Sequence, residues 1–527
     1  MLGDKNGNLT NIWPSLMSGA PPTSPQSSGP GLLGYVVPSN FISHYGQPPA
    51  GVMVVSGNNP TQNGIPRNNF APRFGFAWQP TSNGKFVVRG GLGLFYDRVG
   101  SSDFVHAVEQ GDPYAVTLDF AGPTGAPYSL ANPFPSTPLG FSPRWFDPAT
   151  GANSALNQPF YAAVHTPLSR QYNLNVQYQF APRWVLEVGF VGSSGINQTD
   201  YNHDYNIASL ASPSNPINGV TTNTVANAVY RIPYLGYGPG QLQGTGYDLV
   251  YNYNSLQVTL RHQFSHGLSM QAAYTWSKDL TNVVVAPVGL TYADNQANVN
   301  NPTNTWGDYG PAGFERPQRF VFNYSYDLPF GNPKGALGWL AKGWQLTGVV
   351  VIQDGNPLTL TTVNGGSAFT GGPAANSGES GASTVQLAPG ATYSSLSTPG
   401  GVESRLGGSG SANGYFNLSA ITSNIAINPD GTPTSVAACS TCATLYGNSG
   451  LGVILGPGQF NWDQSVIKTT KFGERESLQF RVEAFNLLNH PQFGNPNTTY
   501  STLSTFGQIT TTSTNPRIVQ LGLKFLF

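Results

Sequence analysis

Histidines are the side chains in this 527-residue sequence that could most readily share a metal ion, and there are seven of them. His262 and His266 are the closest pair, four positions apart. That spacing suits a shared metal when both side chains lie on one face of a helix. Here His266 is the middle residue of a Ser-His-Gly segment at 265–267, which is typical of a short turn, and His262 lies before that turn, so the pair does not share a helix face. A shared metal and a simple pair of polar residues beside a turn both stay open, and the sequence favours the second.

The two cysteines, Cys439 and Cys442, form a CSTC motif. A thiolate zinc site needs four ligands, and the chain contains no second pair of cysteines. A redox CxxC motif stands at the start of a helix in a thioredoxin-like unit, and the surrounding sequence predicts no such helix. We therefore predict a small disulfide that closes a loop in an oxidising compartment.

Other sequence motifs of catalysis or cofactor binding are incomplete or absent. Gly29, Gly31 and Gly34 satisfy GxGxxG, but the strand and helix that must flank a dinucleotide site are missing from the pattern. Residues 4–8 begin like a calcium loop and then lack its glycine at position six and its glutamate at position twelve. Neither a Walker A sequence nor a GxSxG motif occurs. We predict that the protein is not an enzyme and that it needs no cofactor.

The elements that would position these residues are strands. Between 172 and 180, apolar or aromatic residues occupy every even position and Asn or Gln every odd one. The same alternation recurs over 256–264 and 518–527. A period of two predicts strands with one apolar and one polar face. The predicted strands cover 70–78, 85–96, 170–180, 183–193, 253–264, 268–278, 318–328, 342–354, 459–470, 476–487 and 518–527.

The connections between these strands alternate in length. Short turns join the members of each pair, and the pairs are separated by long connections at 99–169, 194–252, 279–317, 361–458 and 489–517. Bacterial outer-membrane barrels have short periplasmic turns and longer extracellular loops. The pattern therefore predicts an all-β fold, an antiparallel transmembrane β-barrel with long extracellular loops. About 11–12 strands are present, roughly half of a 22-stranded barrel.

The composition agrees with this prediction. Only 9% of the residues are charged, against roughly 25% in ordinary soluble domains. No run of apolar residues is long enough to form a transmembrane helix. The net charge of −1 offers no basic patch for nucleic acid.

Several stretches resemble a known family. The block RVEAFNLLNHPQFGNPN, followed by FGQI and NPRIVQLGLKFLF, closely resembles the carboxyl end of TonB-dependent outer-membrane receptors. The nearest group is the Oar-like one, which carries a carboxypeptidase-regulatory-like domain. RNNFAPRFGFAW, FVVRGGLGLFYDR, YNSLQVTLRHQF and ERPQRFVFNYSYDLPFG resemble the same family. We therefore expect residues 67–527 to be the C-terminal portion of the receptor barrel, and residues 1–66 to be a loop-rich segment from the preceding part.

The resemblance implies a location and a set of partners. It implies an outer membrane of the Gram-negative type, with lipid around the wall, an unknown extracellular ligand, and uptake energised by the TonB system. In this class of barrel the assembly machinery reads an aromatic terminal residue in phase with apolar neighbours. Leu521, Leu523, Phe525 and Phe527 supply that pattern.

The amino end and the function carry further expectations. Intact members of the family begin with a signal peptide, a plug and early strands, and none of these is visible at the amino end of the sequence. We therefore expect a shortened chain whose contact with TonB belongs to the missing part. A structural or adhesive surface barrel is the alternative function, because the long loops are rich in Ser, Thr, Gly and Asn.

Overall fold

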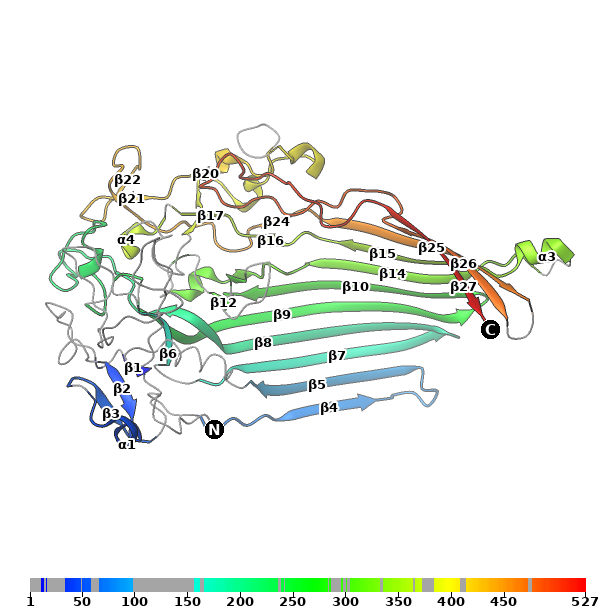
Figure 1. The fold of residues 1–527 in the computed structure, drawn as a ribbon, viewed down its shortest axis with the longest axis horizontal. Coiled ribbons are helices and arrows are strands. Elements are labelled where there is room, and N and C mark those ends of the chain that lie inside the picture. The colour runs from blue at the N-terminus through cyan, green and yellow to red at the C-terminus, as the bar shows by residue number, and fades with distance from the viewer. Residues whose placement is uncertain are drawn as a thin grey trace, which may run out of the picture.

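One large antiparallel sheet dominates the computed structural model, and its strands run along the long axis of the molecule (Figure 1). Thirteen strands belong to this sheet, and eleven of them form its continuous path. The structure describes residues 11–13, 16, 34–48, 50–57, 66–97, 156–161, 165–235, 238–240, 242–282, 284–285, 295–296, 300, 304–331, 335–363, 365–371, 383–407, 414–472 and 476–527.

All eleven strands expected from the alternation are present. In spatial order, which is also chain order, they are β4 (Arg73–Trp78), β5 (Phe86–Tyr96), β7 (Leu168–Ala181), β8 (Trp184–Asp204), β9 (Leu242–Ser265), β10 (Leu268–Thr281), β14 (Gln318–Asp327), β15 (Trp344–Gln353), β25 (Gln459–Lys471), β26 (Ser477–Phe485) and β27 (Ile518–Leu526). Each strand therefore pairs with its neighbours in sequence, as in an up-and-down barrel. The all-β, antiparallel prediction is confirmed.

The register aligns apolar side chains across the sheet from β5 to β25. Tyr178 of β7 lies opposite Leu186 of β8, and Leu186 lies opposite Leu260 of β9. Because side chains alternate between the two faces, the partners in such a row share one face. We call this row the apolar belt, and it consists of Phe86, Tyr178, Leu186, Leu260, Ala272, Phe322, Val350 and Trp462.

The opposite face carries a polar row in the same register. Arg89 lies opposite Asn175, and Gln257 lies opposite Thr275. Its members are Arg89, Asn175, Gly189, Gln257, Thr275, Arg319, Gln353 and Gln459. The sheet thus has one face suited to an apolar medium and one suited to water, as the alternation predicted.

Two predicted boundaries are wrong, the end of the strand at 183–193 and the start of the strand at 253–264. The long connection expected at 194–252 is shorter, because β8 continues to Asp204 and β9 already begins at Leu242. The added residues pair through their backbones without apolar alternation, so the pattern gave no sign of a strand there. The connection expected at 329–341 contains a helix, α3 (Gly335–Ala341), which projects beyond the strand ends (Figure 1).

Smaller elements surround the sheet. Near the amino end, β1 (Asn11–Ile12), β2 (Tyr35–Pro38) and β3 (Met53–Val55) form a separate sheet beside α1 (Phe41–Tyr45). Most of the connection at 99–169 lies outside the described residues. The remaining short strands and helices are β6 (Leu156–Tyr161), η3 (Ala228–Tyr230), β11 (Val284–Val285), β12 (Asn295–Gln296), η4 (Thr305–Asp308), β13 (Gly310–Pro311), β16 (Pro357–Leu358), β17 (Thr361–Thr362), α4 (Ser367–Thr370), β18 (Ser383–Thr384), β19 (Gln386–Leu387), η6 (Tyr393–Leu396), η7 (Val402–Arg405), η8 (Leu418–Ala420), β20 (Ile421–Thr422), β21 (Ala426–Ile427), β22 (Pro433–Thr434), β23 (Ala443–Thr444) and β24 (Ile454–Leu455).

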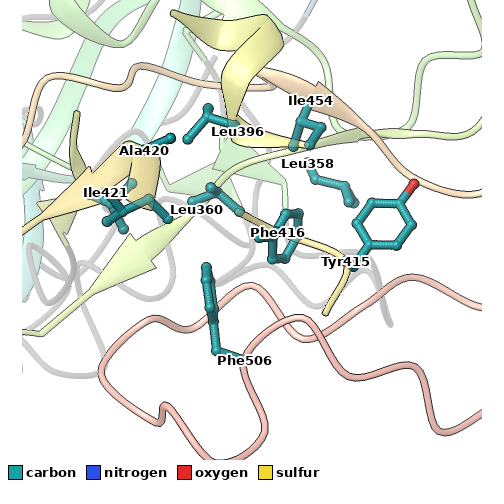
Figure 2. Packing of buried hydrophobic residues seen from close by; sticks show 10 residues of the cluster. Leu358, Leu360, Leu396, Tyr415, Phe416, Ala420, Ile421, Ile454 and Phe506 are labelled. Carbon is teal, nitrogen blue, oxygen red and sulfur yellow. The ribbon is translucent and has the colours of Figure 1, made fainter. Parts of the chain in front are cut away.

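Two of the long connections fold together around a hydrophobic core of their own. The connection after β15 supplies most of this core, and Phe506 from the connection after β26 completes it (Figure 2). The Phe506 ring is fully buried, with its centroid 4.9 Å from that of Phe416 and 5.4 Å from that of Tyr500. The loop core consists of Leu358, Leu360, Val385, Leu396, Tyr415, Phe416, Ala420, Ile421, Ile454 and Phe506.

Phe506→Ala should loosen these two connections while leaving the sheet intact. Removing a buried phenylalanine ring costs about 3–5 kcal/mol in a well-packed core, and here the loss falls on a unit outside the large sheet. We expect much faster limited proteolysis within 361–458, with unchanged heat-modifiable migration of the protein on a gel. Leu503→Ala is the matched control, because Leu503 lies in the same connection and is 51% exposed. Equal protease sensitivity in the two variants would contradict the prediction.

Candidate functional site

The side chains of Asp200, His203 and Asp248 meet where β8 ends and β9 begins. These strand ends lie at the long connection between the two strands, away from the short turns at 182–183 and 266–267. Nδ1 of His203 lies 3.5 Å from Oδ2 of Asp200 and 3.5 Å from Oδ1 of Asp248. One ligand atom from each residue lies within 4.8 Å of the other two. The Asp200 side chain is completely buried, and those of His203 and Asp248 are 19% and 35% exposed.

The electrostatics of this cluster favour a positive charge. Burial lowers the pKa of His203, but the carboxylates of Asp200 and Asp248 raise it by more, so that the pKa reaches about 10. The Tyr205 ring packs edge-on against the imidazole, with centroids 4.6 Å apart. A proton on the imidazole or a metal ion among the three side chains would each supply the charge that the two carboxylates attract.

Sequence reasoning missed this cluster. Asp248 lies far along the chain from His203, and no short motif joins them. Asp200 and His203 are three apart, which in a regular strand places them on opposite faces. Only the pairing of β8 with β9 brings the three residues together. That pairing could not be predicted residue by residue, because its register is irregular at this end of the strands.

The predicted histidine pair is placed at a turn. His262 lies in β9 with its ring centroid 4.4 Å from that of Trp184, and it is 8% exposed. His266 adopts a positive φ of 52° in the turn itself. The hydroxyl of Ser265 lies 3.5 Å from Nε2 of His262 and 3.1 Å from Nδ1 of His266. Packing and turn geometry account for both histidines, in line with the interpretation that the sequence favoured.

Cys439 and Cys442 are joined as a disulfide in the structure, with their Cα atoms 5.3 Å apart. The bond closes a turn in the connection after β15. Its presence in the cell stays a prediction. The intact mass of the purified protein should rise by two hydrogen masses on reduction, and a Cys439→Ser, Cys442→Ser variant should show no such change. An unchanged mass for the wild type would contradict the disulfide.

A family model described as an outer membrane beta barrel domain matches residues 2–520. The chain belongs to this family. The strands of such barrels alternate apolar residues that face lipid with polar residues that face the interior. The apolar belt therefore lies on the lipid-facing side of the sheet, and the polar row lies on the interior side. The protein is located in the outer membrane of a Gram-negative cell. Among the described residues, no helix combines the length and the apolar character needed to cross a membrane.

Several solved structures are similar to this chain at low identity. The outer membrane transporter YddB from Escherichia coli is 10% identical with a TM-score of 0.41, and the match covers 87% of this chain and 41% of that one. The ferric preacinetobactin receptor BauA from Acinetobacter baumannii is 10% identical with a TM-score of 0.36, covering 88% and 38%. The ferripyoverdine receptor of Pseudomonas aeruginosa is 8% identical with a TM-score of 0.33, covering 87% and 33%. The chain thus spans less than half the length of these structures. No curated protein matches the sequence.

Several charged residues of the barrel strands, among them Arg89, Arg481 and Glu483, lie on the interior face. Arg89 donates a hydrogen bond to Oε1 of Gln177 at 3.0 Å, and Arg481 donates one to Oε1 of Gln479 at 2.7 Å. Nη1 of Arg481 also lies 4.0 Å from Oε1 of Glu483. Such contacts hold the charges within the polar wall, where they avoid the cost of facing lipid.

The last barrel strand presents the predicted assembly pattern on the lipid side. Leu521 lies opposite Val482, Leu523 opposite Phe480, and Phe525 opposite Leu478. The rings of Phe525 and Phe527 stack with centroids 6.1 Å apart, and Phe527 is 94% exposed. The face of β27 is therefore continuous with the lipid-facing side of β26 and ends in an aromatic ring.

Proposed function

We propose that this protein forms the outer-membrane wall of a TonB-dependent receptor that takes up an extracellular ligand. The observation that carries the proposal is the resemblance of the strand sequences to that family over 67–527, together with membership of an outer-membrane barrel family. The barrel wall would enclose the pathway, and the long connections would make the first contact with the ligand. TonB and the barrel-assembly machinery are the further partners implied. We likewise propose the division at 66/67 between a loop-rich segment and the receptor barrel.

The edges of the sheet support a wall wider than eleven strands. In the described part of the chain, β4 and β27 stand at opposite ends of the strand order, and no pairing joins them. Unpaired backbone groups facing hydrocarbon cost several kcal/mol each. Both edges therefore need partners in the membrane, and a barrel with about 22 strands would supply them.

Uptake can be tested without knowing the ligand. A strain that lacks the gene and a strain depleted of TonB should fail to remove the same compound from the growth medium, and wild-type cells should remove it. Mass spectrometry of spent medium provides the measurement. Energised uptake would be refuted if the deletion strain and the TonB-depleted strain both removed every compound from the medium as fast as wild-type cells do.

A structural or adhesive surface barrel is the second candidate. The loop core described above gives the connections a folded surface of their own, which suits attachment to another cell or to polysaccharide. Attachment would be lost on deletion of the gene and retained on depletion of TonB. That outcome, with unchanged medium composition, would favour adhesion over transport.

The orientation of the barrel gives a prediction of its own. The short turns should face the periplasm and the long connections the cell exterior. In a Cys439→Ser, Cys442→Ser background, Ser394→Cys should react with an impermeant maleimide on intact cells. Ser265→Cys, at the end of β9 beside the short turn, should react only after the outer membrane is permeabilised. The reverse labelling pattern would invert the topology.

A further inference from the structure

We propose that Asp200, His203 and Asp248 form a binding site for a divalent transition-metal ion of the zinc type, at the outer ends of β8 and β9. The inference depends on the barrel fold and goes beyond the proposed uptake function. It is carried by three independent features of the site, which are its spacing, the bulges in the two strands and an unusual glycine.

The spacing fits a metal better than a shared proton. Charge-assisted N–H···O bonds are about 2.7–2.9 Å long, whereas Nδ1 of His203 lies 3.5 Å from each carboxylate oxygen. In a tetrahedral zinc site the bonds are about 2.0–2.2 Å long, so neighbouring ligand atoms are about 3.3–3.6 Å apart. His203 therefore stands at the distance from both carboxylates that a common metal ion would set.

Bulges bring the three side chains to one face. Asp200 lies opposite Gly246 and His203 opposite Gly244, so β8 advances by three residues while β9 advances by two. The extra residue reverses the alternation between Asp200 and His203. A second irregularity lies between Gly246 and Leu249, where β9 advances by three residues while β8 advances by two, and Asp248 in this segment reaches within 3.5 Å of Nδ1 of His203. Bulges of this kind re-aim side chains beside functional sites.

Gly246 leaves the space that the cluster occupies. A Cβ atom at this position would lie 2.9 Å from Cβ and 2.9 Å from Cγ of His203, and 3.0 Å from Oδ1 of Asp248. Any other residue would therefore displace the imidazole or the carboxylate. The backbone beside the site is also fixed, because the carbonyl of Asp248 accepts a hydrogen bond from Nδ2 of Asn282 at 3.2 Å.

The donor set and the location indicate the class of metal. One imidazole nitrogen and two carboxylate oxygens suit zinc and its neighbours, while calcium prefers six to eight oxygen ligands. Three protein ligands leave a fourth position for water or for an incoming ligand. Asp248 lies eight residues beyond the lipid-facing Leu256, or roughly 26 Å along the strand. The ion would thus join β8 to β9 outside the membrane, at the base of the connection 205–241.

Metal binding to the full-length protein, purified in detergent, tests the proposal. Titration calorimetry with ZnCl₂ at neutral pH should show one site per chain, and Co²⁺ should give the visible absorption of a low-coordinate site. His203→Gln and Asp248→Asn should each weaken zinc binding by about 100-fold or more, since even changes to residues behind the ligands cost 10–100-fold. His266→Gln is the matched control, because it removes an exposed histidine at the opposite end of β9, and it should bind like the wild type.

Gly246→Ala separates the geometry from the ligands. It keeps all three donors and should still weaken zinc binding, while the heat-modifiable migration of the barrel stays normal. Absence of stoichiometric zinc binding in the wild type would overturn the proposal, and so would undiminished binding in His203→Gln. A wild type that binds no zinc, with a His203→Gln variant that is less stable, would identify a protonated imidazole as the ion between the two carboxylates.

Discussion

Val258→Arg is expected to abolish most of the folded barrel, whereas Thr259→Arg, one residue further on, is expected to be tolerated. Val258 lies opposite Val188 and Tyr274 on the lipid-facing side, near the middle of the part of β9 that crosses the membrane. An arginine on the lipid face at the midplane costs about 2–4 kcal/mol. That cost shifts the folding equilibrium by roughly 30- to 700-fold, since each 1.4 kcal/mol is a factor of ten.

Thr259→Arg provides the matched control for the same charge in the same strand. Thr259 lies opposite Glu187 and Ala273 on the interior face, where water and a neighbouring carboxylate can accommodate a guanidinium group. The measurement is the fraction of heat-modifiable protein in outer-membrane preparations. Equal loss in both variants would show that the assignment of the two faces is wrong, and normal folding of Val258→Arg would do the same.

The membrane-crossing strands could be predicted from sequence because lipid imposes a strict rule on them. Every second residue over a stretch such as 172–180 must be apolar, and the register then carries that rule from strand to strand. The rule stops where the wall leaves the membrane. Beyond Ser194 in β8, polar residues continue the strand through backbone pairing alone, so the extension to Asp204 had no signature in the pattern.

The group of Asp200, His203 and Asp248 could not be predicted from the sequence for a related reason. Its formation requires bulges that break the alternation on which strand prediction depends, and a glycine whose role is to leave space. Neither feature is visible without the pairing of β8 with β9. The loop core was equally hidden, because Phe506 and Leu360 come from connections that the sequence shows only as long and polar.

Deleting Phe527 is expected to reduce the amount of assembled barrel in cells to a small fraction of the wild type. Its ring extends the apolar face of β27 by one more position, in phase with Phe525 and Leu523, and it is 94% exposed in the isolated chain. Moving a phenylalanine side chain from water to an apolar medium contributes about 1.5–3 kcal/mol. Without Phe527 the chain ends on Leu526, whose side chain points to the interior face, so the terminal residue is out of phase with the apolar neighbours.

Two comparisons separate recognition by the assembly machinery from simple stability. Phe527→Tyr keeps an aromatic ring in phase and should assemble nearly as well as the wild type, and Leu526→Ser alters the other face and should have little effect. In refolding from denaturant into detergent, where no machinery is present, the Phe527 deletion should lose far less folded protein than it loses in cells. If the deletion fails equally in both settings, Phe527 acts through the stability of the last strand, and its role as an assembly signal is excluded.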